Sequence, residues 1–431
     1  MKLAGNDMLI QSLINEGVEY IFGYPGGAAL HIYDAIFKQK EMQHILVRHE
    51  QGATHAADGY ARATGKPGVV MVTSGPGATN AITGIATAFM DSIPMIVISG
   101  QVQSHLIGTD AFQETDMIGI SRPIVKHSFT VDHQENIPTI VKEAFHIATS
   151  GRQGPVVIDI PKDLTNPDEL FDYEYPKKVS IRSYNPPVEP EQNQVDRVIS
   201  ALKESKRPVI YAGGGTIASN ASDELRELNS YIKVPVTNTL MGLGVYPGTD
   251  KYFLGMLGMH GTYQANMAMH NADLILAIGA RFDDRITNTP SKFAPKAKIV
   301  HFDVDHSSVS KIIEADIAVF GQVKNSLLAI NKKLKLESEE FDEGRFTDWH
   351  NQIADWRKSH GLNHELYLEV DDSKPVLPQA AVQHIYKASE GKAFVTSDVG
   401  QHQMFAAQYY HFDEPRKLSL IHISEPTRRI T

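Results

Sequence analysis

Glu50 is the residue of this sequence whose type and surroundings point most directly to chemistry. It follows a short apolar run, residues 45–47, and opens an alanine-rich segment with the sequence EQGATHAADGYA (50–61). Small side chains let a helix lie close to whatever packs against it, so we expect the carboxyl group to enter a poorly hydrated place. A carboxylate there costs several kcal/mol or must share a proton. Such a group is suited to proton transfer.

Two other interpretations of this segment are open on its residues alone. His49, Glu50 and His55 could suggest a metal site. However, two histidines six residues apart on a helix point about 240° from each other, whereas zinc-binding histidines on one helix are four apart. Glu50 could also be an ordinary helix-start charge that complements the helix dipole. The neighbouring motifs decide between these interpretations.

Three further motifs combine glycine with proline or polar residues. They are FGYPGG (22–27), TSGPGATN (73–80) and GTDAFQE (108–114). Each motif alone indicates little more than a turn or loop. Together with the segment around Glu50, and in this order and spacing, they resemble the acetolactate synthase (acetohydroxyacid synthase) family of thiamine-diphosphate enzymes. The resemblance extends over about residues 3–417.

The resemblance implies a mechanism and a cofactor site. In thiamine chemistry the cofactor attacks a 2-keto acid, carbon dioxide leaves, and the resulting carbanion attacks a second keto acid. One protein carboxylate must hydrogen-bond the aminopyrimidine ring, and Glu50 matches that catalytic residue. Glycines in the neighbouring turns would let the backbone approach the cofactor. The other positions that match the thiamine diphosphate site are Tyr24, Pro25, Gly26, Gly75, Pro76, Asn80, Val399, Gly400, Gln401 and His402.

The same resemblance implies substrate-binding and further catalytic residues. Phe112 and Gln113 match residues that face the substrate pocket, and Lys162 lies near it. Arg285 matches the residue that takes the carboxylate of the second substrate, a role that suits the two-pronged guanidinium. Ordinary alternatives remain: Phe112 could anchor its loop on the core, Lys162 could be solvated, and RFDDR (281–285) could be a self-neutralising surface cluster.

A second glycine motif, AGGGTIA (212–218), follows an apolar run and is a weak dinucleotide-binding signal by itself. An NAD interpretation is weakened because no acidic residue sits convincingly about 20 residues later. The resemblance implies FAD instead, and the RFDDR motif marks the FAD-containing biosynthetic branch of the family. The positions that match the flavin site are Arg152, Gly213, Gly214, Gly215, Thr239, Leu240, Met241, His260, Arg281, Asp283 and Asp303.

The composition is that of a globular protein and excludes several functions. The net charge of −10 argues against electrostatic nucleic-acid binding. The chain has no cysteine, hence no disulfide framework, thiolate nucleophile or cysteine-ligated metal. No apolar stretch approaches the roughly 18 residues of a membrane span, and the N-terminus has no secretory pattern. We expect a soluble cytoplasmic protein.

Apolar runs alternate with helical patterns along the chain, which indicates an α/β fold with helices on both faces of parallel sheets. The resemblance implies the doubly wound parallel-sheet domains of thiamine-diphosphate enzymes. Strands are expected over residues 68–73, 95–99, 156–160, 209–211, 274–278, 299–304 and 394–396. Helices are expected over residues 78–90, 136–148 and 192–204.

Composition shifts and the resemblance together suggest the domain organisation. We expect a pyrimidine-binding domain (1–165), a proline-rich linker (166–190), a central FAD-binding domain (191–335), a charged linker (336–373) and the start of a diphosphate-binding domain (374–417) with one strand.

Residues 418–431 match nothing expected in the family, and we interpret them as a non-native tail after a truncation. The Mg²⁺ ligands of the family would lie beyond it, so no metal ligand is assigned. The chain alone is then expected to be inactive and to expose apolar surface near its end.

The resemblance also implies partners. They are pyruvate and 2-oxobutyrate as substrates, a homodimer or tetramer whose site lies between two chains, and a small regulatory subunit; thiamine diphosphate, Mg²⁺ and FAD are the cofactors. The alternatives are another thiamine-diphosphate enzyme, of glyoxylate carboligase or pyruvate oxidase type, or a non-catalytic flavin-binding fragment. The carboligase lacks the carboxylate that Glu50 supplies, and the oxidase lacks the RFDDR motif.

Two positions depart from the family. Gln322 stands where an aspartate usually lies near the adenosine part of the flavin, which puts that contact in doubt. Gln103 replaces the usual proline at a position associated with herbicide sensitivity. We therefore predict that the enzyme is comparatively insensitive to sulfonylureas.

Overall fold

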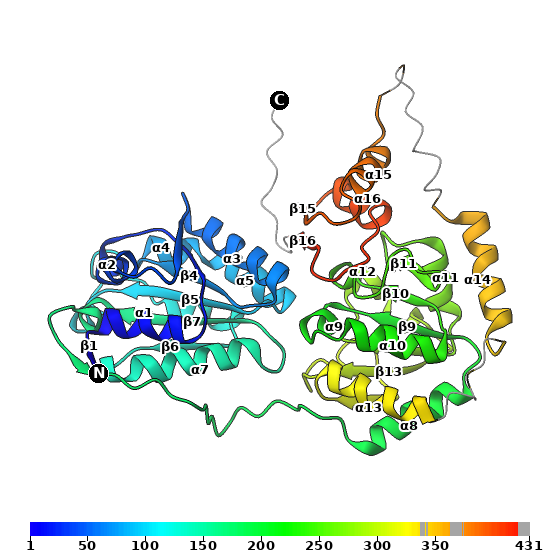
Figure 1. The fold of residues 1–431 in the computed structure, drawn as a ribbon, viewed down its shortest axis with the longest axis horizontal. Coiled ribbons are helices and arrows are strands. Elements are labelled where there is room, and N and C mark those ends of the chain that lie inside the picture. The colour runs from blue at the N-terminus through cyan, green and yellow to red at the C-terminus, as the bar shows by residue number, and fades with distance from the viewer. Residues whose placement is uncertain (337–340, 342–343, 363–372, 374, 421–431) are drawn as a thin grey trace. The chain divides into compact units, whose positions relative to one another are not determined.

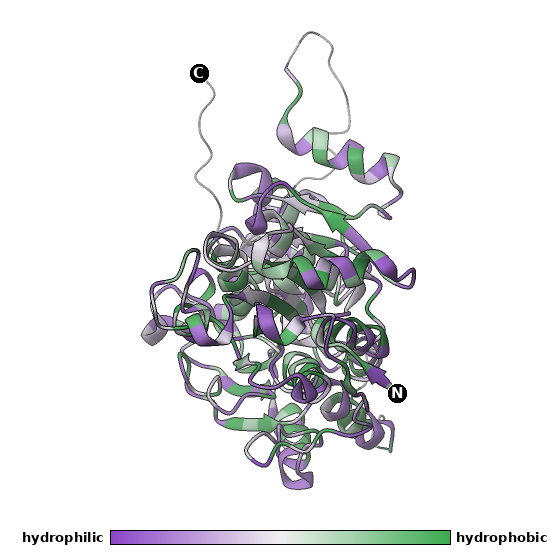
Figure 2. Cartoon of the chain, turned by 90° about the vertical axis from the view of Figure 1, so that its left-hand side faces the viewer, coloured by the Kyte–Doolittle hydropathy of each residue, from purple (hydrophilic) through white to green (hydrophobic). Residues whose placement is uncertain are grey.

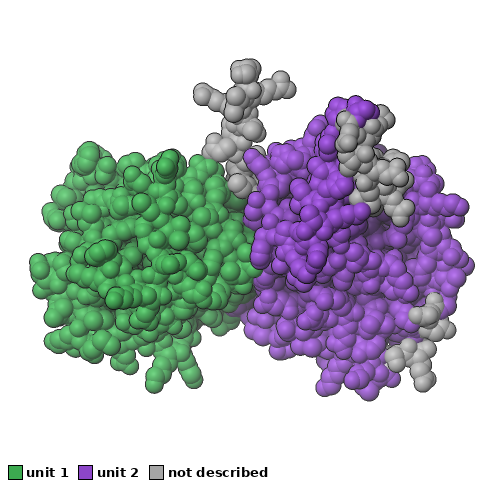
Figure 3. Space-filling view, turned by 45° about the horizontal axis from the view of Figure 1, so that its top comes forward, with its two compact units in different colours: residues 1–185, 421–431 green, residues 186–420 purple. Residues whose placement is uncertain are grey.

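The computed structural model describes residues 1–336, 341, 344–362, 373 and 375–420 (Figure 1). These residues form two compact units, 1–185 and 186–420 (Figure 3). The boundary between the units falls inside the segment 166–190 for which we expect a linker. In the described part of the chain, no helix combines the length and apolar character needed to cross a membrane.

The first unit is built on a six-stranded parallel sheet in the order β3-β2-β4-β5-β7-β6. Every residue of the central strands β4, β5 and β7 is buried, which explains their continuous apolar runs. The strands are β2 (Tyr20–Gly23), β3 (Gln43–Leu46), β4 (Gly68–Val72), β5 (Met95–Gln101), β6 (His127–Thr130) and β7 (Pro155–Pro161).

Helices cover both faces of this sheet and make two separate cores. Alternate residues of one strand face opposite cores, as the strand period requires: Val70 packs with α3 and α5, and Met71 packs with α1 and α7. The helices are α1 (Gly5–Asn15), α2 (Leu30–Lys38), α3 (Glu50–Thr64), α4 (Pro76–Asn80), α5 (Ile82–Asp91), α6 (Met117–Ser121) and α7 (Ile137–Thr149). The 3-10 turns are η1 (Gly27–Ala29), η2 (Ser104–Leu106), η3 (Arg122–Ile124), η4 (Gln134–Asn136) and η5 (Lys162–Thr165).

Helix α3 carries a buried ion cluster. The Arg62 guanidinium pairs with Asp58 one turn earlier on α3 and with Asp91 at the end of α5, where Nη2 and Oδ2 are 2.8 Å apart. All three side chains are buried. The cluster therefore joins two helices on the same face of the sheet.

The expected linker is attached to both units. On the first unit, β8 (Phe171–Asp172) pairs antiparallel with β1 (Lys2–Leu3). Farther along, Lys126 Nζ donates to Tyr184 Oη at 2.7 Å. On the second unit, the Val188 carbonyl accepts from Gln322 N at 3.0 Å.

The second unit contains another six-stranded parallel sheet, in the order β11-β10-β9-β12-β13-β14. The chain enters at β9, proceeds outward to β11, and returns to the other side of β9 for the last three strands. The order therefore reverses between β9 and β12. The strands are β9 (Pro208–Ala212), β10 (Val236–Asn238), β11 (Phe253–Met256), β12 (Leu274–Ile278), β13 (Lys298–Asp303) and β14 (Ile317–Phe320).

Helices surround this sheet. Figure 2 colours the chain by hydropathy, and the helices that it shows carry both hydrophilic and hydrophobic stretches. The helices around this sheet are α8 (Gln192–Glu204), α9 (Gly214–Ala218), α10 (Ser222–Ile232), α11 (Tyr263–Asn271), α12 (Asp284–Thr287), α13 (Val323–Leu336) and α14 (Thr347–His360), with the 3-10 turns η6 (Leu240–Gly242) and η7 (Pro290–Lys292). The described part of the expected linker 336–373 differs from our expectation: it contains α14, whose buried Trp349 donates from Nε1 to the Pro208 carbonyl at 3.1 Å. The rest of that segment, residues 337–340, 342–343 and 363–372, lies outside the described residues.

The last segment also differs from the prediction. It contains two strands where the sequence suggested one, because residues 418–420, which we assigned to a tail, form β16 (Leu418–Leu420) parallel to β15 (Val395–Ser397). Residues 421–431 lie outside the described residues. The helices are α15 (Pro378–Ala388) and α16 (Gln401–Tyr409).

The core of this segment is shared with the central sheet region. Its buried Ala407, Tyr410 and Phe412 pack with Leu243 and Met256. Other apolar side chains of the segment are exposed, as expected near the end of the chain: Val376, Leu377, Ile385 and Phe394.

Candidate cofactor and substrate sites

Five neighbouring strands of the first unit lead, at their carboxyl ends, into segments that carry predicted site residues. Gly26 follows β2, Glu50 follows β3, Gly75 follows β4, Gln113 follows β5 and Lys162 follows β7. The strands are parallel and adjacent, so these ends form one edge of the sheet. The strand order reverses between β2 and β4, and ligands of doubly wound folds bind at such a reversal.

Glu50 is buried at this edge, with 8% of its surface exposed. It opens α3 because His49 caps the helix by accepting from Gln51 N at 3.2 Å. Asn80 Nδ2 donates to Glu50 Oε2 at 2.9 Å. Burial, and secondarily the charge of Glu50, raise the pKa of Tyr33. The carboxyl group is therefore held in a desolvated place by an amide from the TSGPGATN motif.

Glycines make room around this carboxyl group. A Cβ on Gly77 would lie 3.3 Å from Glu50 Oε1 and 2.7 Å from Thr73 Cγ2. A Cβ on Gly26 would lie 2.5 Å from the same Thr73 atom. The turns after β2 and β4 thus meet at Thr73, beside Glu50, and leave a space that larger residues would fill.

The loop of residues 108–114 lies against the turn after β4. Gly75 has a φ of +55°, and a Cβ there would lie 2.6 Å from the Gln113 carbonyl oxygen. Gln113 itself has a left-handed φ of +58°. Phe112 is 89% exposed, so the alternative that it anchors the loop on the core is wrong for the described structure.

Two sets of hydrogen bonds hold this part of the chain: one involves Glu114 within the loop, and the other involves the turn after β7. Glu114 accepts from the backbone of Gly108 and, at 2.9 Å, from Ala111 N, and these bonds lower the pKa of Glu114. Asp163, next to the half-buried Lys162, accepts from Ser104 N at 2.8 Å. The segment carrying Lys162 is therefore tied to the chain that leads into the loop.

In the second unit, the positions predicted for the flavin also follow the carboxyl ends of neighbouring strands. Gly213, Gly214 and Gly215 follow β9; Thr239, Leu240 and Met241 follow β10; His260 follows β11; Arg281 and Asp283 follow β12; Asp303 ends β13. Arg152 is the exception, because it belongs to the first unit, where its Nε donates to Ser92 Oγ at 2.8 Å.

The local geometry fits a nucleotide-type cofactor. A Cβ on Gly213 would lie 2.3 Å from the Gly279 carbonyl oxygen, so this glycine lets the turns after β9 and β12 pack closely. The nearest neighbour of a Cβ on Gly214 would be Met241 Cβ at 3.2 Å. Within the described residues, the buried Thr239 hydroxyl has no hydrogen-bond partner. A buried polar atom of this kind is destabilising unless it is paired, and a bound ligand can supply the partner.

The RFDDR motif forms one close ion pair and one long one. Arg281 Nη2 lies 2.9 Å from Asp283 Oδ2, whereas Arg285 Nε lies 3.6 Å from Asp284 Oδ2 and its side chain is 71% exposed. An exposed pair at that distance contributes little. The alternative that the motif is a self-neutralising surface cluster therefore fits Arg281, which is paired with Asp283. It fits Arg285 less well, because the guanidinium of Arg285 is accessible.

Sequence reasoning missed His301, which lies beside the flavin positions. It is fully buried on β13, its Nε2 is 2.9 Å from the Ala280 carbonyl, and burial lowers its pKa to about 4. Its ring packs edge-on against Phe282. The sequence signal that could have drawn attention to His301 is its position inside an otherwise apolar strand, two residues before Asp303.

The four positions predicted for the diphosphate lie on the last segment and are exposed. Val399 and Gly400 lead into α16, which starts with Gln401 and His402. The expected arrangement of a strand, a glycine and a helix start is therefore present. Among the described residues, no group of three or more His, Cys, Asp or Glu is arranged to hold a metal ion.

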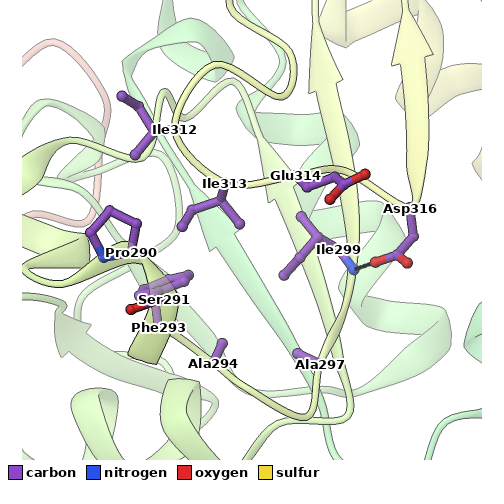
Figure 4. Close-up of a pocket in the computed structure, with 10 residues that line it drawn as sticks. All are labelled: Pro290, Ser291, Phe293, Ala294, Ala297, Ile299, Ile312, Ile313, Glu314 and Asp316. Carbon is purple, nitrogen blue, oxygen red and sulfur yellow. Dashed lines mark hydrogen bonds between the residues drawn. The ribbon is translucent and has the colours of Figure 1, made fainter.

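A pocket of about 400 Å³ lies at the opposite, amino edge of the second sheet (Figure 4). In Figure 4, Ile299 at the start of β13 and Asp316 just before β14 lie on one side, and Pro290 and Ile313 lie on the other. Asp316 Oδ2 accepts from Ile299 N at 2.7 Å. No position predicted for the flavin lines this pocket, so it is separate from the candidate cofactor edge.

Comparison with known proteins identifies the family of both units. Residues 3–120 match the family described as thiamine pyrophosphate enzyme, N-terminal TPP binding domain, and residues 195–330 match its central domain. The acetolactate synthase large subunit of Haemophilus influenzae is 54% identical over 418 residues, which cover 96% of this chain and 71% of the relative.

Two other relatives give the same family. The acetolactate synthase isozyme 3 large subunit of Escherichia coli is 52% identical over 96% of this chain and 71% of its own length. The chloroplastic acetolactate synthase of Arabidopsis thaliana is 43% identical over 96% of this chain and 60% of its own length. The resemblance seen in the sequence is thereby confirmed, and the chain belongs to the acetolactate synthase large-subunit family of thiamine pyrophosphate enzymes.

Proposed function

We propose that this chain is a catalytic subunit of acetolactate synthase, which decarboxylates pyruvate and joins the remaining two-carbon unit to a second 2-keto acid, pyruvate or 2-oxobutyrate. Bound thiamine diphosphate supplies the nucleophilic carbon. The observation that carries the proposal is the buried Glu50 carboxyl group, held by Asn80 beside glycine-lined turns.

Glu50 is the residue that handles a proton. Its Oε2 is engaged by Asn80, and its Oε1 faces the gap left by Gly77. We assign to Glu50 the hydrogen bond to the aminopyrimidine ring. Asn80 then holds the carboxyl group in position, while Tyr24, Pro25, Gly26, Gly75 and Pro76 line the ring site.

The substrate side is assigned to the exposed loop and its neighbours. Phe112 and Gln113 would contact the first keto acid, with Lys162 close to them, and the accessible guanidinium of Arg285 would bind the carboxylate of the second. A guanidinium can donate to both oxygens of a carboxylate at once.

FAD, Mg²⁺ and the assembly are further parts of the proposal. The Thr239 hydroxyl, which has no hydrogen-bond partner among the described residues, and the glycine turn after β9 support a structural flavin on the second unit. We assign the diphosphate to the region of residues 399–402 and include Mg²⁺ as a cofactor for which no ligand is assigned. A homodimer or tetramer, a small regulatory subunit and a cytoplasmic location complete the proposal.

The test is the Glu50→Gln variant in the holoenzyme. The amide keeps the shape of the side chain but cannot take up the proton, so the rate of cofactor C2–H exchange should fall by orders of magnitude. Glu41→Gln, a change of the same kind at an exposed residue, is the control and should exchange normally. Near-normal exchange in Glu50→Gln would rule out this role.

A further inference from the structure

Gln101, at the end of β5, connects three parts of the first unit through one buried side chain. It is 4% exposed. Its Nε2 donates to Asp159 Oδ2 at 3.0 Å and to the Thr115 carbonyl at 2.8 Å, and its Oε1 accepts from Val102 N at 2.8 Å. The amide is therefore bound on every side, and one of its bonds reaches the residue that directly follows the loop 108–114.

Asp159 is the buried end of this connection. It lies on β7, opposite Ser99 of β5, and is 3% exposed. Burial raises the pKa of Asp159 to about 7; bonds from Gln101 and Ser99 oppose the rise, and the nearby Asp116 carboxylate adds to it. The position of the Gln101 amide is thus fixed from within the sheet.

The loop has few apolar contacts of its own. Residues 107–110, Phe112 and Gln113 are exposed. Within the loop, Glu114 accepts from the backbone of Gly108 and Ala111. Polar contacts near its two ends tie the loop to the rest of the unit: Ser104 with Asp163 on one side and Thr115 with Gln101 on the other. The bond from Gln101 therefore contributes to fixing the loop.

We propose that Gln101 and Asp159 are positioning residues that hold the loop 108–114, and with it Gln113, at the substrate site. This inference rests on the proposed function for the importance of the loop. It adds two residues that touch neither the substrate nor the cofactor and act through the loop.

The test compares Gln101→Glu, Asp159→Asn and the double variant. An ionised glutamate at position 101 cannot donate to the Thr115 carbonyl, so at a pH at which it is ionised, amide hydrogen exchange in residues 108–114 and the KM for pyruvate should each rise about tenfold, the factor that corresponds to one lost internal hydrogen bond. The cofactor C2–H exchange rate should not change, because it depends on Glu50. The Asp159→Asn side chain can still accept from Gln101, so loop exchange should stay at its normal level.

The double variant separates anchoring from general stability. The amide introduced at position 159 can donate to the carboxylate introduced at position 101 and restore the side-chain pair. The Thr115 carbonyl keeps its bond from Met117 N but still lacks the bond from position 101, so the KM should remain raised while thermal stability recovers. If Gln101→Glu does not fold, the double variant carries the test alone. Gln43→Glu, an exposed change in the same unit, is the control.

Two results overturn different claims. A normal KM and normal loop exchange in the double variant would refute the anchoring role. Fast amide hydrogen exchange in the loop together with a normal KM would support the anchoring role but refute the assignment of the loop to the substrate site.

Discussion

The buried Asp159 makes a quantitative prediction about stability and pH. Burial raises its pKa from 3.8 to about 7 in the folded protein. Each pKa unit corresponds to about 1.4 kcal/mol, so about three units correspond to roughly 4 kcal/mol. Because the folded pKa is the higher one, the folded state binds more protons between about pH 4 and pH 7, and stability falls as the pH rises through that window.

Asp159→Asn should remove this dependence. Asparagine does not titrate, so the variant should gain up to about 4 kcal/mol relative to the unmodified protein between pH 4 and pH 8. The free energy of opening should be measured by hydrogen exchange of the β7 amides, which belong to the first unit. Trp349 and Trp356 both lie on α14 of the second unit, so their fluorescence is an internal control that should not change.

The exposed Asp168→Asn is the matched control. A pH dependence in Asp159→Asn that equals that of the unmodified protein would refute the reasoning, because some other group would then be responsible for it.

Three further changes test other parts of the structure. Arg62→Met removes the cation that pairs with two buried carboxylates and should cost about 3–5 kcal/mol in unfolding experiments at pH 7. Lys66→Met removes one partner of an exposed pair and should cost less than about 1 kcal/mol; similar losses in both variants would contradict this interpretation of the cluster. Arg285→Ala should reduce acceptor use far more than decarboxylation in product analysis, and equal losses would count against its role. Gln103 has a φ of −57°, which proline adopts without strain, so the Gln103→Pro variant should fold. Inhibition curves should show that this variant is more sensitive to sulfonylureas than the unmodified enzyme. Identical curves would refute the prediction.

Local patterns predicted most of the fold correctly. The expected helix 192–204 coincides with α8, whose start is fixed by a capping box between Glu191 and Gln194. The expected strand 274–278 coincides with β12. The expected helix 78–90 is interrupted at Ala81, between α4 and α5, which a hydrophobic period does not reveal.

The errors occurred where distant contacts decide the structure. The α14 region appeared to be a linker because its composition is charged, but Trp349 bonds to a carbonyl 141 residues away. Residues 418–420, which we assigned to a tail, became a strand by pairing with β15.

The site was predicted unevenly for the same reason. The turn motifs drew attention to Gly26, Glu50 and Gly75, which the structure places after neighbouring parallel strands; their roles in cofactor binding stay predictions. Gln101 and Asp159 were not singled out, because their contact depends on the pairing of β5 with β7 and joins residues 58 positions apart. A buried polar partner at that separation leaves no periodic signal in the sequence.

The attachments of the segment between the two units leave a very short hinge. Tyr184 is bonded to the first unit and Val188 to the second, so only Asn185, Pro186 and Pro187 lie between the two anchored points. Proline fixes φ near −65°, which removes one of the two soft torsions at two of these three residues. Any swivelling of one unit against the other must therefore be absorbed by a few remaining torsions, unless the hydrogen bond of the tyrosine breaks first.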